Sequence, residues 1–127
     1  MDKHSSLASL ILRLGMGGMM LVHGYGKLER LMDGNWDFAD PLGIGSAPTL
    51  LLAVFTEFLC SVLLIIGFKT RLASIPLIIT MLIAAFVIHL DDPWKRQEFA
   101  LLYAVGFIAI LILGGGRYSL DDRLSHR

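Results

Sequence analysis

The sequence predicts an all-α fold, a four-helix transmembrane bundle with up-down topology. Hydrophobic residues make up 55% of the 127-residue chain, and its mean hydropathy is +0.68. Soluble domains are about 45–50% apolar, so water is not expected to be the only solvent of this chain. Four apolar runs are each close to the roughly 17–25 residues that cross a bilayer, and they lack the polar stripe of soluble core helices. The length indicates one domain, residues 1–127.

The four spans are expected at about residues 5–27, 48–68, 72–90 and 97–114. The first run could be a signal peptide, because Lys3 precedes it, but its apolar part exceeds the usual roughly 7–15 residues and no small-residue cleavage site follows. We therefore expect it to be retained as the first span. The second run carries only Glu57 as an ionisable group, the third ends near His89, and the fourth opens at Glu98.

The connections predict the topology. Short loops at 68–71 and 91–97 force antiparallel neighbours. The longer loop between the first two spans, residues 29–48, either covers the outer mouth of the bundle or is an ordinary interfacial loop. On the side of the termini there are six Lys and Arg residues, namely Lys3, Lys69, Arg71, Arg117, Arg123 and Arg127. The other side has four, namely Lys27, Arg30, Lys95 and Arg96, so the positive-inside rule predicts that both termini are cytoplasmic.

Charge and cysteine content exclude several classes of function. The chain has 11 basic and 11 acidic residues and no net charge, so nothing indicates binding to nucleic acid. The single cysteine, Cys60, excludes an internal disulfide and a multi-cysteine metal or iron–sulfur site.

Two charged residues lie inside the apolar runs and call for partners. A charge at mid-membrane costs at least roughly 2.5–3.5 kcal/mol on insertion scales. Counted from opposite ends of antiparallel spans, Arg13 and Glu57 fall at similar heights, so we expect an inward ion pair, direct or bridged by water. Such a pair would bind a ligand or only fix how the two helices dock.

Further polar residues are expected to gather in the outer half of the bundle. Arg13, Met20, His23 and Lys27 share a sector of about 80° on the first helix, which should face the interior. With one residue from each span, His23, Glu57, His89 and Glu98 form the candidate catalytic set. Arg13, Lys27 and Tyr103 are candidate binding residues, although Tyr103 lies about 140° from Glu98 around the fourth helix and joins only if its ring turns inward.

The chain resembles the DoxX family of small bacterial membrane proteins along nearly its whole length. The matching pieces are LRLGMGGMMLVHGYGKL, DFADPLGIG, LLAVFTEFLCSVLLIIGFKTRLASIPL, AAFVIHLDDP, EFALLYAVGF and GGGRYSLD, in this order. The resemblance implies a four-helix bundle in the bacterial inner membrane. Some relatives are linked to thiosulfate:quinone oxidoreductase or to membrane oxidoreductase complexes that counter oxidative or thiol stress. The family pattern falls here on His23, Gly24, Lys27, Leu28, Glu57, His89, Glu98, Leu101, Leu102 and Tyr103.

Three functions follow from these observations. The first is a subunit or accessory of a quinone-linked oxidoreductase, in which a histidine contacts the quinone and a carboxylate relays protons. The second is a metal site formed by His23, Glu57, His89 and Glu98. The third is a non-catalytic scaffold. Candidate partners are the lipid bilayer, a quinone, a redox protein and further copies of the chain; whether the chain is itself an enzyme stays open, because it contains no electron carrier of its own.

Overall fold

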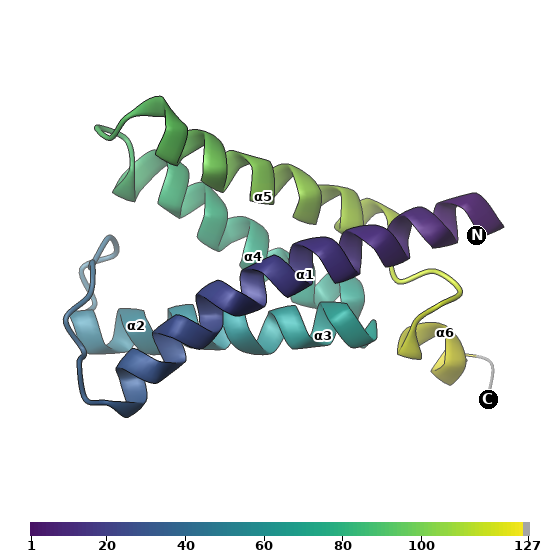
Figure 1. The fold of residues 1–127 in the computed structure, drawn as a ribbon, viewed down its shortest axis with the longest axis horizontal. Helices are drawn as coiled ribbons and strands as arrows, with labels where there is room; N and C mark the ends of the chain where they lie inside the picture. The colour runs from purple at the N-terminus through teal and green to yellow at the C-terminus, as the bar shows by residue number, and fades with distance from the viewer. Residues whose placement is uncertain (126–127) are drawn as a thin grey trace.

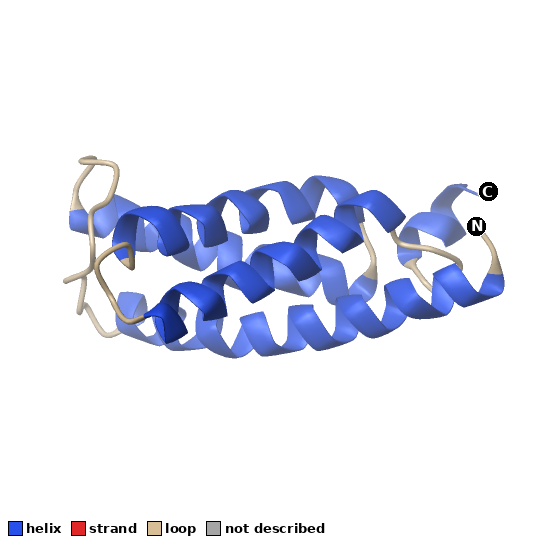
Figure 2. Cartoon of the chain, turned by 90° about the horizontal axis from the view of Figure 1, so that it is seen from above, coloured by secondary structure: helices blue, strands red, loops and turns tan. Residues whose placement is uncertain are grey.

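Four long helical segments run back and forth along a common axis, as predicted (Figures 1 and 2). The structure is a computed structural model that describes residues 1–125, and all regular structure in this part of the chain is helical. The first segment is α1 (Lys3–Met32). The second comprises α2 (Ser46–Val54), the π-helical turn η1 (Phe55–Leu59) and α3 (Cys60–Ile66). The third comprises α4 (Thr70–Ile83) and the π-helical turn η2 (Ala84–Ile88), and the fourth is α5 (Trp94–Leu113), followed by the short α6 (Leu120–Ser125).

Each segment is long and apolar enough to cross a membrane. They contain 30, 21, 19 and 20 residues, and a helix rises about 1.5 Å per residue against a hydrocarbon core about 30 Å thick. Large apolar side chains point outward along them, for example Val22, Leu72 and Ile112, which are 73%, 64% and 72% exposed. Lipid accounts for this exposure, and the chain is a multi-pass membrane protein. Each predicted span overlaps one segment, although α1 extends further at both ends than expected.

The packing follows the order of the chain. α1 packs along the second segment and against α5, and α4 packs along α5 and against α3. The buried core lies between all four segments and consists of Met20, Cys60, Leu64, Ala73, Leu77, Met81, Tyr103, Ala104, Phe107 and Ile110. Small residues on α1 let the helix backbones approach closely, as is usual in membrane bundles.

The connection between α1 and α2 folds back on its own flanking helices. The indole nitrogen of Trp36 donates to the carbonyl of Leu31, 2.9 Å away, which holds the loop against the end of α1. The Asp40 carboxylate accepts from the amides of Gly45 and Ile44 and from the Thr49 hydroxyl, at 2.9, 3.0 and 3.1 Å. These hydrogen bonds, that from Gly45 first, lower the pKa of Asp40 and fix the start of α2.

The opposite end of the bundle holds both termini (Figures 1 and 2). There Asp121, in α6, accepts hydrogen bonds from the backbone amides of Lys69 and Thr70 at 2.7 and 2.9 Å, and its own amide donates to the carbonyl of Gly67. The C-terminal segment thus caps the first turn of α4 from outside that helix. Arg127, which entered the count of basic residues, lies outside the described residues.

Candidate functional site

Two glycines set how α1 lies on the second segment. Gly17 packs against Ser61 and Leu64, and Gly24 packs directly against the backbone of Glu57. These two contacts bring the C-terminal third of α1 beside η1. Lys27 follows Gly24 by three residues, so it lies on the same face one turn further out.

Glu57 is a buried carboxylate on a π-helical turn. Only 2% of the residue is exposed, and its carboxylate forms an ion pair with the ammonium of Lys27. Because an unpaired charge in this environment is expensive, the ion pair with Lys27 offsets part of the cost of burying Glu57. π-helical turns are rare and occur frequently at functional sites. Two of the candidate residues, Lys27 and Glu57, therefore form one unit.

The loop between α1 and α2 contacts the lysine of this ion pair. The ring of Phe38 lies 5.4 Å from the Lys27 ammonium and 5.6 Å from the Arg30 guanidinium, within the range of cation–π contacts. The loop therefore contributes a side chain to the site. Phe38 belongs to the stretch expected either to cover the outer mouth or to lie at the interface, and here it contacts two cations of α1.

His23 and Tyr103 meet beside the ion pair. Their rings contact edge to face, with 6.0 Å between centroids. Tyr103 is 8% exposed, so its ring does turn inward, and it stacks between Phe99 and Phe107 of the same helix, at 6.1 and 6.0 Å. This aromatic row fixes the ring of Tyr103 against α1.

An apolar cavity of about 300 Å³ opens next to Tyr103, between α1 and α5. It is lined by Met16, Met19, Phe99, Leu102 and Tyr103. Met19 and Leu102 are 54% and 61% exposed on the outer surface of the bundle, so the cavity is open towards the lipid. A volume of this size is at the lower end of the range of small-molecule sites, about 300–1,000 Å³. Tyr103 is thus the one residue that both lines this cavity and contacts the polar group, through the exposed ring of His23 on α1.

The two remaining catalytic candidates lie apart from this site. His89 ends η2, and its Nδ1 lies 2.7 Å from a carboxylate oxygen of Asp92 in the following loop. This hydrogen bond is the main cause of the lowered pKa of Asp92. Glu98 is exposed on α5, as the angle of about 140° between it and the buried Tyr103 requires. The structure therefore does not bring His89 and Glu98 together with Glu57.

The geometry also gives no support to the metal alternative. Within residues 1–125, no three His, Cys, Asp or Glu side chains are close enough to hold a metal ion. The set of His23, Glu57, His89 and Glu98 proposed for a metal is consequently wrong as a coordination shell. His89 instead contacts Asp92, three residues further along the chain, and Glu57 forms its ion pair with Lys27.

The direct ion pair expected between Arg13 and Glu57 is wrong. Arg13 is fully buried, and its guanidinium donates to the carbonyls of Leu64 and Ile65, at 3.1 and 3.3 Å, and to that of Tyr118, at 2.7 Å. The packing of Gly17 and Gly24 sets Arg13 opposite the end of α3, about two turns from Glu57. A cation at the C-terminal end of a helix satisfies free carbonyls and interacts favourably with the helix dipole. Arg13 therefore belongs to the end of the bundle that holds both termini and lies outside the candidate site.

Comparison with known proteins identifies the family. The DoxX family profile matches residues 8–90, more than half of the chain. The chain belongs to the DoxX family. An uncharacterized protein of Haemophilus influenzae is 28% identical over 97% of this chain and 95% of its own length. The protein named "Putative oxidoreductase CatD" of Bacillus subtilis is 27% identical over 95% of this chain and 90% of its own length. No solved structure matches.

The match to DoxX begins within α1 at residue 8 and ends at residue 90, and so includes His23, Lys27 and Glu57. In this DoxX protein the other wall of the site is supplied by α5, which lies beyond the matched residues. Phe38 and three residues of the cavity lining, Met16, Met19 and Phe99, were not predicted from the sequence. The spacing of Phe99, Tyr103 and Phe107 at four-residue intervals was a usable signal for the aromatic row, whereas nothing in the sequence placed Phe38 beside Lys27.

Proposed function

We propose that this DoxX protein is a quinone-binding subunit of a membrane oxidoreductase system. The observation that carries the proposal is that Tyr103 lines the apolar cavity and also contacts His23, which precedes Lys27 of the Lys27–Glu57 ion pair by one helical turn. A quinone has an apolar tail, a flat ring and two carbonyl oxygens that take up protons when the ring is reduced. The ring fits the cavity between α1 and α5, and the tail extends past Met19 and Leu102 into lipid.

The proposed roles follow from the chemistry of each side chain. The Tyr103 hydroxyl and the His23 imidazole are hydrogen-bond donors for a quinone oxygen. The Glu57 carboxylate exchanges protons with the site, and the Lys27 ammonium holds that carboxylate in place through their ion pair. Arg13, His89 and Glu98 have no role at the quinone in this proposal.

The electrons come from a partner protein with its own redox centre, since the chain contains no iron–sulfur cysteines or nucleotide fingerprint. The reductant belongs to the thiol or thiosulfate class. Two thiols lose two electrons and two protons to give one disulfide, and the quinone gains two electrons and two protons to give one quinol. The name of the B. subtilis relative supports an oxidoreductase role in general terms.

The proposal includes the location of the protein in the bacterial inner membrane with both termini in the cytoplasm. It is supported by the excess of Lys and Arg at the end of the bundle that holds the termini. A single cysteine introduced at Ser125 or at Asn35, in a Cys60→Ala background, tests it in intact cells. A membrane-impermeant maleimide should label the cysteine at 35 and leave that at 125 unlabelled, and the reverse pattern would refute the orientation.

Quinone binding by the purified protein is the decisive experiment. Detergent-solubilised protein is titrated with short-tailed ubiquinone and menaquinone analogues by calorimetry, and reductant-dependent quinol formation is measured in membranes that contain each variant. Tyr103→Phe and Glu57→Gln should lower quinol formation by roughly 100-fold, the usual effect of losing a proton-transfer group. Glu98→Gln, which removes an exposed carboxylate from the same helix as Tyr103, should leave it unchanged.

Two results would count against the proposal. Failure of any quinone to bind saturably would remove the substrate. Constant co-purification of a partner protein, with no effect of Tyr103→Phe or Glu57→Gln on that partner's activity, would instead indicate the scaffold function.

A further inference from the structure

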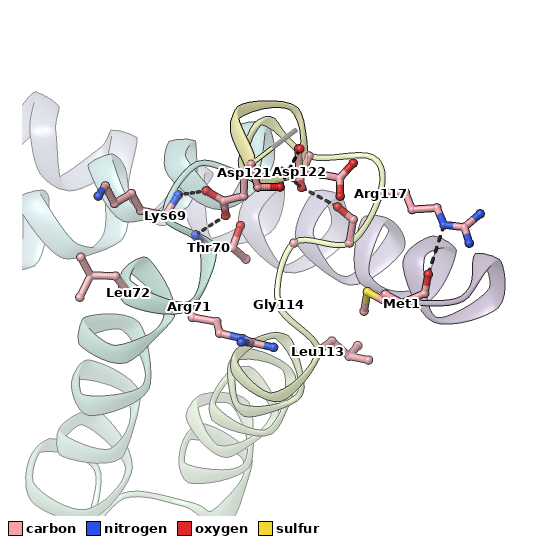
Figure 3. Close-up of a pocket in the computed structure, with 14 residues that line it drawn as sticks. Met1, Lys69, Thr70, Arg71, Leu72, Leu113, Gly114, Arg117, Asp121 and Asp122 are labelled. Atoms are coloured by element: carbon pink, nitrogen blue, oxygen red, sulfur yellow. Dashed lines mark hydrogen bonds between the residues drawn. The ribbon is translucent and has the colours of Figure 1, made fainter. Parts of the chain in front are cut away.

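A second, open cavity lies at the end of the bundle opposite the candidate quinone site. It has a volume of about 780 Å³ and is lined by the start of α4, the end of α5, α6 and the glycine-rich segment 114–116 (Figure 3). The proposed quinone function makes no use of it. Its position at the boundary between the helices and the water-exposed tail makes it accessible from one membrane surface.

Three basic side chains line this cavity without a carboxylate partner. Lys69, Arg71 and Arg117 are all exposed, and among the described residues none of them forms an ion pair. Arg71 donates to the carbonyl of Ile112 at 3.3 Å, and the Nε of Arg117 donates to that of Met1 at 3.2 Å. A guanidinium has five N–H donors, so most donors of both arginines remain for a ligand.

The acidic residues of the lining do not cancel this positive charge. The Asp121 carboxylate is engaged by the amides of Lys69 and Thr70. Burial raises its pKa, but these hydrogen bonds outweigh that effect, and the pKa of Asp121 lies below its ordinary value. Counting Asp122 as well, three positive and two negative side chains give the lining a net charge of +1.

Gly114 brings the Arg71 guanidinium onto the backbone at the end of α5. Its φ of +76° is a conformation that favours glycine, and a Cβ there would lie 3.1 Å from the Nε and Nη2 of Arg71. Any side chain would therefore displace the guanidinium. Figure 3 shows Arg71 between the ends of α4 and α5, directly below Gly114.

The membrane-facing rim of the cavity is apolar. Leu72 and Leu113 line it beside Arg71, and Leu72 is 64% exposed. A cavity with cations on the water side and leucines on the lipid side matches a molecule with an anionic head and an aliphatic body. A small soluble anion would make no apolar contact with these leucines.

We propose that this cavity binds the phosphate head group of an anionic phospholipid. The Arg71 and Arg117 guanidinium groups contact the phosphate oxygens, with Lys69 adding to the local positive charge, and the acyl chains pass Leu72 and Leu113. Basic pockets between membrane helices are known binding sites for such head groups.

The test compares lipids with and without net charge. Protein in a neutral detergent is titrated by calorimetry with short-chain phosphatidylglycerol, short-chain phosphatidylcholine and, as a soluble phosphate, glycerol phosphate. Phosphatidylglycerol should bind saturably and most tightly. Arg71→Gln should weaken it about fivefold and Arg71→Gln with Arg117→Gln about 25-fold, since each basic residue at a lipid surface contributes on that scale. Lys95→Gln, which removes an exposed cation from the other end of α5, is the matched control and should change nothing.

Three results would overturn the proposal. Equal affinity for both lipids would remove the charge recognition. Equal weakening by Arg71→Gln and Lys95→Gln would show a general charge effect without a site. Glycerol phosphate binding as tightly as phosphatidylglycerol would assign the cavity to a soluble anion.

Two controls separate a loss of binding from a loss of fold. The melting temperatures of the variants in detergent alone should equal that of the wild type. Arg71→Lys, which keeps the charge, should retain most of the affinity.

Discussion

Gly24 of α1 lies against the peptide group of Glu57, so that an ideal Cβ at Gly24 would stand 2.6 Å from the Glu57 carbonyl carbon. The neighbouring atom is backbone and cannot rotate away. This contact decides which residues of α1 face η1, and it holds Lys27 within reach of the Glu57 carboxylate. The geometry of the site therefore requires a residue without a Cβ at position 24.

Gly24→Ala should consequently destabilise the protein by about 1–3 kcal/mol, the usual effect of overpacking. The free energy of unfolding in mixed detergent micelles measures this. Gly26→Ala is the control, because a Cβ at Gly26 meets no atom within 4 Å and alanine is the better helix former. If both variants were equally stable, the close approach of α1 to η1 would be refuted.

The ion pair at the site predicts a non-additive pair of substitutions. Lys27→Met leaves the Glu57 carboxylate buried without its cation and should cost about 3–5 kcal/mol. Adding Glu57→Gln removes the charge that was left behind, so the double variant should recover most of this stability. Unfolding free energies of the four proteins form a double-mutant cycle. Equal and additive losses would mean that the two side chains do not interact.

Much of the architecture could be predicted from the sequence because the bilayer fixes it. The thickness of the hydrocarbon core sets the length of each apolar run, and short connections at 68–71 and 91–97 leave only antiparallel neighbours. The inward turn of Tyr103 and the exposure of Glu98 also follow from helix geometry, since one helix cannot bury two residues about 140° apart.

The pairing of the charged residues could not be predicted in this way. Heights counted from the ends of the spans ignore how far two helices slide along each other, and here the close contacts of Gly17 and Gly24 decide that. Arg13 therefore lies at the end of α3. The cation beside Glu57 is Lys27, where Arg13 had been expected. For His89, a partner three residues along the chain was closer than any on another helix.

Arg13 of α1 forms hydrogen bonds with the end of α3 and with the segment that follows α5. Its loss should therefore release the C-terminal segment. Arg13→Met leaves the carbonyls of Leu64, Ile65 and Tyr118 without their donor and should destabilise the protein by more than about 3 kcal/mol, since a single hydrogen bond to a charged group contributes about 1.5–3 kcal/mol. Limited trypsin digestion should then cleave at Arg117 and Arg123 faster than in the wild type. Lys3→Met, which removes an exposed cation from the same helix, should leave the digestion rate unchanged, and unaltered cleavage in Arg13→Met would contradict the anchoring role.

Acid should also loosen the C-terminal segment, through Asp121. The pKa of this carboxyl is lowered in the folded protein, so its contribution to stability is fully present above its ordinary value of 3.8 and is lost as the pH falls through the lower folded value. Trypsin cannot be used at such pH, so pepsin cleavage of the C-terminal segment is the measurement. Cleavage should accelerate as the pH falls below about 4 in the wild type, whereas Asp121→Asn should be cleaved readily and with less dependence on pH throughout. Identical pH profiles for the two proteins would exclude Asp121 as the acid-sensitive cap of α4.

The apolar cavity beside Tyr103 can be closed without changing any polar group of the site. Leu102 lines it and is 61% exposed towards lipid, so Leu102→Trp can fill the slot from its open side with little effect on the core. Quinone affinity in the titration described above should fall at least about tenfold, because a ligand that loses its apolar contact area loses more than about 1.4 kcal/mol. Ile112→Trp is the matched control, since Ile112 lies on the same helix, is 72% exposed and does not line the cavity. If Leu102→Trp bound quinone as tightly as Ile112→Trp, the ring would have to bind elsewhere, and Tyr103 and His23 would lose their proposed contact with it.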